Sequence, residues 1–313
     1  MIRSALFSLC LGLIHLAVVV LLSPLLLGIV TRIKAYVAGR TGPPLLQLYF
    51  DLAKLARKDA VFSRSTTWVF LAGPLAAVAI PATAALLVPM GSARAPLGFS
   101  GDLILFAYLF ALARFLTVLS ALDTGSSFEG MGAAREVAFA ALAEPALFLG
   151  LAALASFSGS LSLGPLLTVA GRGWGIASGP LILVLAGWVL VFMVENCRIP
   201  FDDPATHLEL TMIHEVMVLD HSGPPLGLVL YGASMKFLVL GTLLVKLCLP
   251  TTGNPWLDWP AYFGGLGLLA VGVGLVESTM ARLKLNRVPQ LLVVAVLSSA
   301  FGFLMLLLQP TLR

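Results

Sequence analysis

Charged residues are scarce in this sequence: they make up 11% of its 313 residues, whereas 59% are hydrophobic. The mean hydropathy is accordingly high, at +1.01. A soluble domain needs more polar surface than this to cover its core. The composition therefore excludes an ordinary soluble domain and predicts a protein whose solvent is lipid.

Cysteine is also rare. The three cysteines, Cys10, Cys197 and Cys248, are far apart and form no CxxC motif. Such a set cannot by itself hold an iron–sulfur cluster or a structural zinc ion. We therefore expect no metal or cofactor bound by this chain, and we assign any redox chemistry to partner subunits.

Internal repeats and low-complexity tracts are absent from the sequence. Many secondary transporters are built from inverted repeats, so this absence weakens a transporter interpretation. The apolar stretch after Arg3 also lacks a small-x-small cleavage site. We interpret that stretch as a first membrane helix rather than a signal peptide.

What the sequence does have is a succession of eight long apolar runs. Crossing a bilayer takes roughly 20 residues, and each run is long enough. They predict an all-α, polytopic integral membrane protein with about eight transmembrane helices, forming a single domain over residues 1–313. The runs are residues 5–31, 68–90, 101–121, 136–157, 179–197, 226–249, 259–281 and 288–308.

The basic residues indicate the orientation of this bundle. Most of them lie in the joints after the first, fifth and seventh runs. The positive-inside rule predicts that these joints face the cytoplasm and that both termini lie outside. Because the basic residues flank apolar runs, the net charge of +4 does not indicate nucleic acid as a partner.

Two amphipathic segments are predicted on the cytoplasmic side. Residues 43–58 place Leu48 and Leu52 on one helical stripe and Asp51 and Lys54 on another, which is typical of a helix lying in the membrane interface. The second segment is the joint at 198–225. There Asp203 can cap a helix with proline at its first position, which predicts a surface helix over about 205–220.

Three histidines in the second segment are spaced by seven residues: His207, His214 and His221. On one helix they would share a stripe, with successive side chains about 10 Å apart, too far to bind one metal ion. They fit either a polar docking face for a partner or a proton buffer at the cytoplasmic mouth.

Several charged residues fall within the predicted membrane helices. An ionised side chain in hydrocarbon costs at least about 2.5–3.5 kcal/mol, so each needs a partner, water or a neutral form. From the helical rise, Arg114 lies about 12 Å and Glu144 about 13–15 Å into consecutive helices, which predicts an ion pair. Lys236, about 15 Å in, and Glu277, about 8 Å in, are predicted to form a second pair.

Glu136 and Glu195 lie near the same boundary, so the six residues would form one polar layer. One interpretation is structural, with ion pairs that fix the helices and boundary carboxylates that are simply hydrated. The other is a protonatable path, because carboxylates and amines stacked in a low dielectric can pass protons through intervening water. Pro145, directly after Glu144, favours the path because it frees a backbone carbonyl. Lys246, near the outer end, is predicted to snorkel.

Four stretches, read in order, resemble one family. They are Gly42-Pro43 with Leu46-Gln47, Asp51 and Lys54-Leu55; Arg114-Phe115 through Leu122-Asp123-Thr124-Gly125-Ser126 and Gly132-Ala133-Ala134-Arg135-Glu136 to Glu144-Pro145; Glu195-Asn196, Arg198, Pro200-Phe201-Asp202 and Leu208-Glu209-Leu210; and Glu277-Ser278 with Met280-Ala281-Arg282-Leu283. They are similar to the membrane subunit shared by NADH:quinone oxidoreductase (complex I, its subunit 1) and the group 4 energy-converting [NiFe] hydrogenases, including formate hydrogenlyase and hydrogenase-4. The second and fourth resemble the hydrogenase branch more.

The resemblance implies a non-catalytic subunit of an oxidoreductase complex in a bacterial or archaeal cytoplasmic membrane. It would dock hydrogenase-like large and small subunits that hold the iron–sulfur clusters and a nickel–iron site, and would join them to antiporter-like membrane subunits. The six buried charges would form the coupling path. The docking or cavity-lining residues implied are Asp51, Lys54, Arg135, Arg198, Asp202, Asp203, Glu209 and Glu215.

The chain departs from the complex I pattern after Pro200-Phe201-Asp202, where complex I has a dense acidic run and this chain has Asp203 followed by Pro204 and uncharged residues. The departure weakens the expectation of a bound quinone. Three alternatives therefore stay open beside the hydrogenase-type coupling subunit: a quinone-chamber subunit of a quinone reductase, a secondary ion transporter, and a pure scaffold.

Overall fold

The computed structural model describes the backbone of residues 2–202 and 212–308, and the side chains from residue 11 onward within those ranges. Over the described residues the chain is helical, with no strand beyond an isolated bridge between Met90 and Ala93. Within these described ranges, seven helices are long and apolar enough to cross a membrane. The prediction of an all-α, polytopic membrane fold is confirmed.

The membrane-length helices match the predicted apolar runs closely. They are α1 (Ile2–Val37), α4 (Asp102–Asp123), α5 (Ser127–Ser158), α7 (Ser178–Glu195), α8 (Gly223–Cys248), α9 (Pro255–Thr279) and α10 (Val288–Leu308). The remaining apolar run forms α3 (Val69–Ala85), which is shorter. Helix α5 begins nine residues before the predicted start at residue 136, which places Glu136 and Glu144 well inside it.

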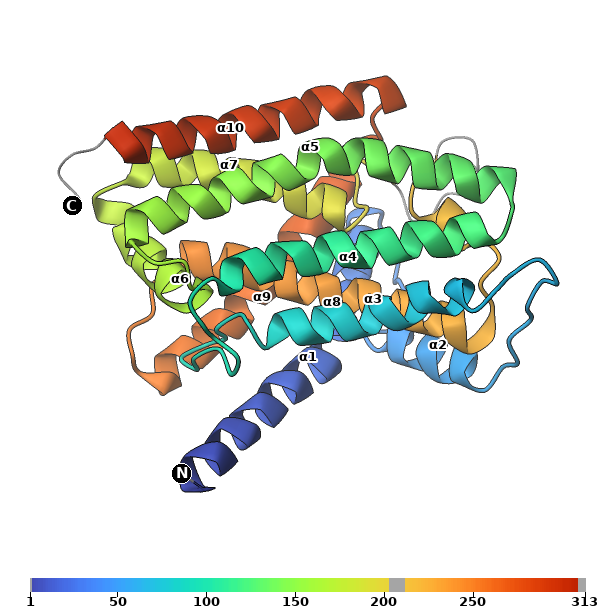
Figure 1. Ribbon diagram of the computed structural model, residues 1–313, viewed down its shortest axis with the longest axis horizontal. Helices are drawn as coiled ribbons and strands as arrows, with labels where there is room; N and C mark the ends of the chain where they lie inside the picture. Colours follow the sequence, from blue (N-terminus) through green and yellow to red (C-terminus); the bar gives the residue numbers. More distant parts are fainter. Residues whose placement is uncertain (1, 203–211, 309–313) are drawn as a thin grey trace.

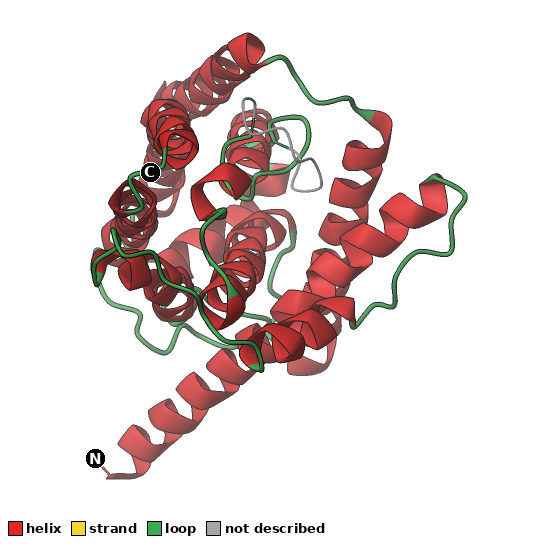
Figure 2. Cartoon of the chain, turned by 90° about the vertical axis from the view of Figure 1, so that its right-hand side faces the viewer, coloured by secondary structure: helices red, strands yellow, loops and turns green. Residues whose placement is uncertain are grey.

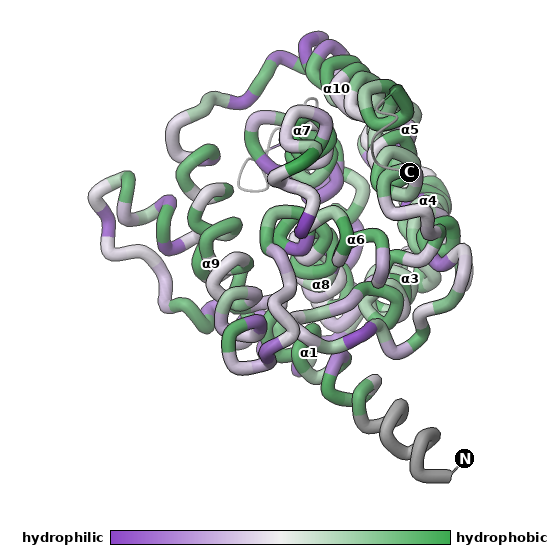
Figure 3. Tube along the Cα trace, turned by 90° about the vertical axis from the view of Figure 1, so that its left-hand side faces the viewer, coloured by the Kyte–Doolittle hydropathy of each residue, from purple (hydrophilic) through white to green (hydrophobic). Residues whose placement is uncertain are grey.

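Helix α8 is the centre of the bundle. Of its most apolar window, 72% is buried, against 28% to 50% for the other long helices. Figure 3 looks along the bundle and shows α8 surrounded by α1, α3, α6, α7 and α9. Helix α8 is apolar around most of its circumference, and such a helix needs this position. On the outside, α10 packs on α5 and α7, and α3 packs on α4.

Close packing of α3 on α8 depends on a small residue. A Cβ atom added at Gly232 of α8 would lie 2.1 Å from the carbonyl oxygen of Ala77 in α3. Glycine at this position lets the two backbones approach, which is how small residues act in membrane bundles. The approach helps to bring the inward faces of α3, α4 and α8 together.

Helix α1 is tilted away from the bundle. Its first half projects from the other helices (Figure 1), and Leu13, Ile14 and Leu21 are exposed. Its second half packs on α9 and α8. The projecting half therefore offers an apolar surface to lipid or to another membrane subunit.

The two ends of the bundle differ. One end carries the short helix α2 (Gln47–Ala56) and the joint that begins at residue 198; we call it the α2 end, and Figure 2 views the bundle from it. The other holds both chain termini and a short helix, α6 (Leu163–Arg172), that was not predicted; we call it the terminal end. Helix α2 lies within the segment 43–58 where the sequence predicts a helix.

The predicted surface helix over 205–220 is wrong for its described part. Residues 203–211, which include Asp203, His207 and Glu209, lie outside the described residues. From Met212 onward the chain forms only a short 3-10 helix, Glu215–Val218, whose last three residues are buried. Three consecutive buried residues cannot belong to an amphipathic surface helix, in which burial recurs every three or four residues.

Candidate functional site

Arg114 of α4 is the centre of a group of buried charges. Its Nε lies 3.2 Å from Oε1 of Glu136, its Nη1 donates to Glu144, and its Nη2 donates to Glu195. Lys236 adds a second cation, with Nζ 2.7 Å from Oε2 of Glu195. We call these five residues the charged cluster. They come from α4, α5, α7 and α8, so the cluster ties four helices together.

The helical period explains how one guanidinium reaches three carboxylates. Glu136 and Glu144 are eight residues apart on α5, which puts them about two turns apart on one face. Arginine has five N–H donors that point outward in the plane of the guanidinium group, so one side chain can bond to several carboxylates at once. The prediction that Arg114 and Glu144 pair is confirmed by their contact.

Burial is uneven across the charged cluster. The Arg114 and Glu195 side chains are only 8% and 7% exposed, whereas Glu144 is 39% exposed. Glu144 lies about 26 Å from the start of α5 and about 21 Å from its end, by the helical rise. The charged cluster therefore extends from the core to the bundle surface near the middle of a membrane helix.

The charged cluster carries a surplus of carboxylate. It has two cations, Arg114 and Lys236, and three acids, so its formal charge is −1 when every group is ionised. The two cations therefore do not fully balance the three carboxylates of the charged cluster.

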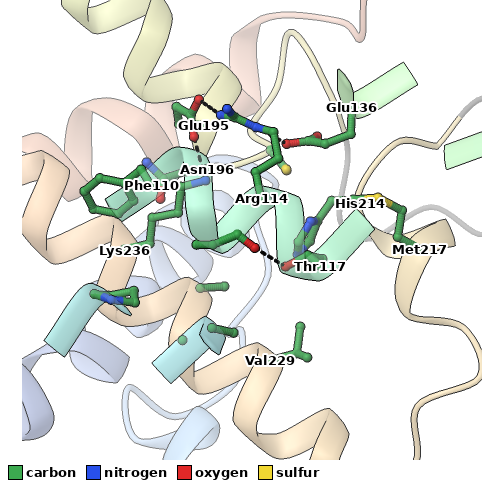
Figure 4. A pocket seen from close by; sticks show the side chains of 16 residues that line it. Phe110, Arg114, Thr117, Glu136, Glu195, Asn196, His214, Met217, Val229 and Lys236 are labelled. Atoms are coloured by element: carbon green, nitrogen blue, oxygen red, sulfur yellow. Dashed lines mark hydrogen bonds and ion pairs between the residues drawn. The ribbon is translucent and has the colours of Figure 1, made fainter. Parts of the chain in front are cut away.

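A cavity of about 80 Å³ adjoins the charged cluster. Figure 4 shows Arg114, Glu136, Glu195 and Lys236 around it, with His214 and Asn196 alongside. Phe110, Met217 and Val229 supply apolar wall. A buried water needs about 10–15 Å³ and several polar partners, so this space suits a few waters. It is well below the roughly 300 Å³ at which small-molecule sites begin.

The predicted pair between Lys236 and Glu277 is wrong. Glu277 of α9, whose side chain is fully buried, is paired with two other residues: Lys34 Nζ of α1 lies 2.8 Å from its Oε2, and Arg198 Nη1 lies 3.3 Å from its Oε1. The single predicted layer of six is therefore two groups. The Arg198 guanidinium lies 5.6 Å from the centroid of the Phe237 ring, next in sequence to Lys236, which brings the two groups near each other.

Lys34 is a site residue that sequence reasoning missed. Lys34 lies in the joint after the first predicted apolar run, which ends at about residue 31. It therefore counts among the basic residues that indicate the orientation of the bundle in the membrane. Helix α1 continues to Val37, and α1 packs beside α9. The additional helical turn is what makes Lys34 a partner for Glu277.

Asp202 holds the joint after α7 against the bundle. Its Oδ2 accepts the backbone N–H groups of Ile213, at 3.0 Å, and His214, at 3.2 Å, and its Oδ1 lies 2.9 Å from Nη2 of Arg282. Arg135 of α5 donates to the Met212 carbonyl at 2.7 Å. These contacts place His214 beside the cavity. Asp202 and Arg135 therefore position this segment.

The other predicted docking residues lie apart from the charged cluster, at the α2 end. Asp51 accepts a hydrogen bond from Gln47 at 2.9 Å, Lys54 is exposed, and Glu215 is half-buried in the 3-10 helix. These residues place charged groups near the joint that begins at residue 198. Their role in docking stays a prediction.

The His221 side chain is buried rather than exposed at the surface. Its ring stacks on Phe70 with centroids 4.0 Å apart, and its Nε2 lies 3.4 Å from Oγ of Ser120. Burial lowers the pKa of His221 below its ordinary value. His214 and His221 therefore do not share a helical stripe: one lines the cavity and the other supports the contact between α3 and the joint.

Lys246 was predicted to snorkel, and this prediction is wrong, because the residue is buried and donates to the carbonyl oxygen of Gly91. It lies toward the terminal end of α8, away from the charged cluster. Among the residues the structure describes, no group of three or more His, Cys, Asp or Glu side chains is arranged to hold a metal ion.

Comparisons with known proteins agree with this arrangement. Formate hydrogenlyase subunit 4 of Escherichia coli (strain K12) is similar, 33% identical over 292 residues, which cover 89% of this chain and 92% of that protein. Hydrogenase-4 component C of the same strain is 35% identical over 235 residues, 74% of this chain and 73% of that protein. An NADH-quinone oxidoreductase subunit of Rubrobacter xylanophilus is 28% identical over 187 residues, 57% of this chain and 56% of that protein.

Among solved structures, a chain of the membrane-bound sulfane sulfur reductase, an archaeal respiratory membrane complex, has the same fold. It matches with a TM-score of 0.80, covering 96% of this chain and 99% of that one, at 20% identity. Residues 10–308 match the NADH dehydrogenase family. This match spans nearly the whole chain, including the stretches around Arg114, Glu195 and Glu277, so the chain belongs to the NADH dehydrogenase family.

Proposed function

We propose that this chain is the membrane anchor and coupling subunit of a complex I-related, redox-driven proton-translocating complex of the group 4 hydrogenase type. It docks a peripheral arm that holds iron–sulfur clusters and a nickel–iron site, and it relays protons sideways to antiporter-like membrane subunits. The proposal rests on one observation: the charged cluster extends from a cavity that fits a few waters to the half-exposed Glu144 in the middle of α5.

The mechanism needs a charge change outside the chain and a group that responds inside it. The cavity is lined by Glu136 and Glu195 and by His214, whose backbone N–H is bonded to Asp202. A change in charge at a docked cluster would shift the proton affinity of these acids. Such coupling requires a differential interaction between two states, which carboxylates near a charge-changing centre supply.

Arg114 then links the cavity to the surface. A proton taken up at Glu136 or Glu195 removes the charge of that carboxylate and weakens its ion pair with Arg114. The guanidinium then interacts more strongly with Glu144. Glu144 would exchange its proton with a neighbouring subunit across the α4–α5 surface. Pro145 supports this step, because it leaves the Ala141 carbonyl without its helical donor and thereby offers water an acceptor beside Glu144.

The names of similar proteins favour this class of partner. Two of them belong to formate hydrogenlyase and hydrogenase-4, and each is at least 33% identical to this chain. The joint that begins at residue 198 and helix α2 lie together at the α2 end, where the sequence predicts the cytoplasm (Figure 2). The α2 end is therefore the proposed docking face for the arm.

The cavity disfavours the quinone-chamber alternative. A volume of about 80 Å³ beside the charged cluster suits waters rather than a quinone headgroup with its apolar tail. The transporter alternative is disfavoured because similar proteins are named as parts of larger assemblies. We therefore propose the coupling subunit alone.

The test is to tag the full chain in its native membrane, solubilise the membrane mildly, and identify what co-purifies. The expected result is a hydrogenase-like large subunit with nickel, iron and acid-labile sulfide in the same preparation. Iron–sulfur subunits with quinone and without nickel would move the assignment to the quinone reductase. A chain that purifies alone and transports ions in liposomes would establish the transporter instead.

A further inference from the structure

The terminal end of the bundle carries a second pocket, remote from the charged cluster. Its volume is about 620 Å³, within the range of about 300–1,000 Å³ that is usual for ligand sites. Its walls come from the segment 89–98 after α3, from α6, from the last turns of α8 and from the start of α9. Figure 3 looks onto this end, where α6 lies beside α8. Neither the proposed coupling path nor its docking face uses this pocket.

The pocket is positively charged. Three basic residues line it, Arg94, Arg172 and Lys246, against one acid, Asp258. The lining therefore carries a formal surplus of two positive charges. Arg94 and Arg172 are exposed, whereas Lys246 is only 6% exposed, so the pocket has a charged floor and a charged rim.

The charge of Asp258 acts on Lys246, but the two side chains form no ion pair, because the Asp258 carboxylate is bonded to the neighbouring loop. Its Oδ1 accepts the Thr252 N–H at 2.9 Å and the Thr252 hydroxyl at 2.8 Å, and its Oδ2 accepts the Gly253 N–H at 3.0 Å. No carboxylate oxygen of the described side chains lies within 4.0 Å of Lys246 Nζ, which donates to the Gly91 carbonyl. An ammonium group has three donors, and burying one without an anion is costly. A bound anion would offset that cost.

The surroundings of the pocket point to the source of the anion. Residues next to its lining in sequence are large, apolar and exposed: Leu97 is 51% exposed, Phe99 49% and Leu161 52%, and Val169 of the lining itself is 38% exposed. A free phosphate needs no such surface. A lipid uses apolar and basic side chains together, because its acyl chains cover the apolar ones while its phosphate binds the basic ones.

We propose that this pocket binds the phosphodiester of an acidic phospholipid headgroup. Lys246 meets the phosphate from the floor of the pocket and Arg94 and Arg172 meet it from the rim, while the hydroxyl of Ser92 lies in the same lining and can donate a further hydrogen bond. One headgroup would then connect segments that are distant in sequence, and the acyl chains would lie along the exposed apolar residues of the same end.

The test uses the complex that contains the full chain, delipidated in detergent and titrated with dioleoylphosphatidylglycerol or dioleoylphosphatidylcholine while bound lipid is counted by native mass spectrometry. The informative variant is Arg94→Gln with Arg172→Gln, since both side chains are exposed and their loss should leave the fold intact. The matched control is Arg40→Gln with Arg57→Gln, two exposed arginines at the α2 end.

The expected result is that the wild type and the control bind phosphatidylglycerol with equal affinity and prefer it to phosphatidylcholine. The Arg94/Arg172 variant should bind phosphatidylglycerol about tenfold or more weakly and should lose its preference for it over phosphatidylcholine. Lys246→Gln should show the same loss. An Arg94/Arg172 variant that keeps full affinity would overturn the proposal. So would displacement of the lipid by millimolar inorganic phosphate, which would make the pocket a site for free anions.

Discussion

Nζ of Lys236 lies 2.7 Å from Oε2 of Glu195, and this ion pair joins the central helix α8 to the last residue of α7. Because Glu195 also accepts from Arg114, it is the one carboxylate of the charged cluster that both cations contact. Glu195 therefore links the two cations of the charged cluster.

A double-mutant cycle should reveal this partnership. Lys236→Met and Glu195→Gln are expected to be non-additive, with an interaction free energy of about 0.5–3 kcal/mol, because the two side chains are in contact. Lys236→Met and Glu277→Gln should add within about 0.5 kcal/mol, since Glu277 is paired with Lys34 and Arg198 instead. The measurement is the midpoint of thermal unfolding in detergent for each single and double variant. Strong coupling of Lys236 with Glu277 would contradict the arrangement of two groups.

Removal of Arg114 should be the most damaging single change in the charged cluster. Arg114→Met would leave three carboxylates facing one another with only Lys236 to compensate, and breaking a buried pair from one side costs about 3–5 kcal/mol. We expect loss of folded protein, measured as the yield of monodisperse chain after solubilisation. Adding Glu195→Gln to the same variant should restore part of that yield, because it removes one of the unpaired charges. A single variant with normal yield would show that the guanidinium is dispensable.

Sequence reasoning succeeded for Arg114 and Glu144 because depth along consecutive helices was enough to bring them together. It failed for Lys236 and Glu277 because depth says nothing about rotation around the helix axis. Glu277 and Gly274 lie on one face of α9, and Gly274 packs on Ile33 of α1, so Glu277 faces Lys34 rather than α8.

The joint after α7 was mispredicted for a different reason. Its conformation is set by long-range contacts: Asp202 and Arg135 hold the backbone at residues 212–214, and no local pattern encodes those bonds. Helix α6 was missed because its ten residues are too few to cross a membrane, although Leu163, Leu166, Leu167 and Ala170 recur at a helical period.

The contact between α3 and α8 should be intolerant of even a methyl group. Gly232→Ala places a Cβ where the Ala77 carbonyl now lies, and such overpacking costs about 1–3 kcal/mol. We expect a lower midpoint of thermal unfolding. Gly264→Ala in α9 is the matched control, because nothing lies within 4 Å of the added Cβ and alanine favours the helix. A control that is destabilised as strongly as Gly232→Ala would mean that the close approach does not matter.

His221 should make the protein less stable in mild acid. Burial lowers its pKa in the folded protein, so the folded state resists a proton that the unfolded state accepts at the ordinary value of 6.5. The stabilisation is therefore fully present above that value and is lost as the pH falls below it. The measurement is the unfolding midpoint of wild type and of His221→Phe, which can still stack on Phe70, between about pH 8 and about pH 5. The wild type should lose more stability than the variant over this range, and parallel curves would exclude His221 as the source.

The coupling role of the charged cluster can be separated from its structural role at Glu144. Glu144→Gln keeps a polar side chain of the same length that can still accept a hydrogen bond from Arg114, and it removes only the negative charge. We therefore expect normal assembly and most of the electron-transfer activity of the complex, but loss of most of its proton translocation, measured as acidification in vesicles that contain the purified complex.

Asp59→Asn, at an exposed residue of the α2 end, is the matched control and should translocate protons normally. Because Glu144→Gln removes the one acid through which the charged cluster reaches the bundle surface, a specific loss of pumping identifies Glu144 as the exit of the path. Loss of assembly together with pumping would instead assign Glu144 to the structural pair with Arg114. Unchanged pumping in Glu144→Gln would reduce the chain to a scaffold, with its charges serving only to fix the register of α4 and α5.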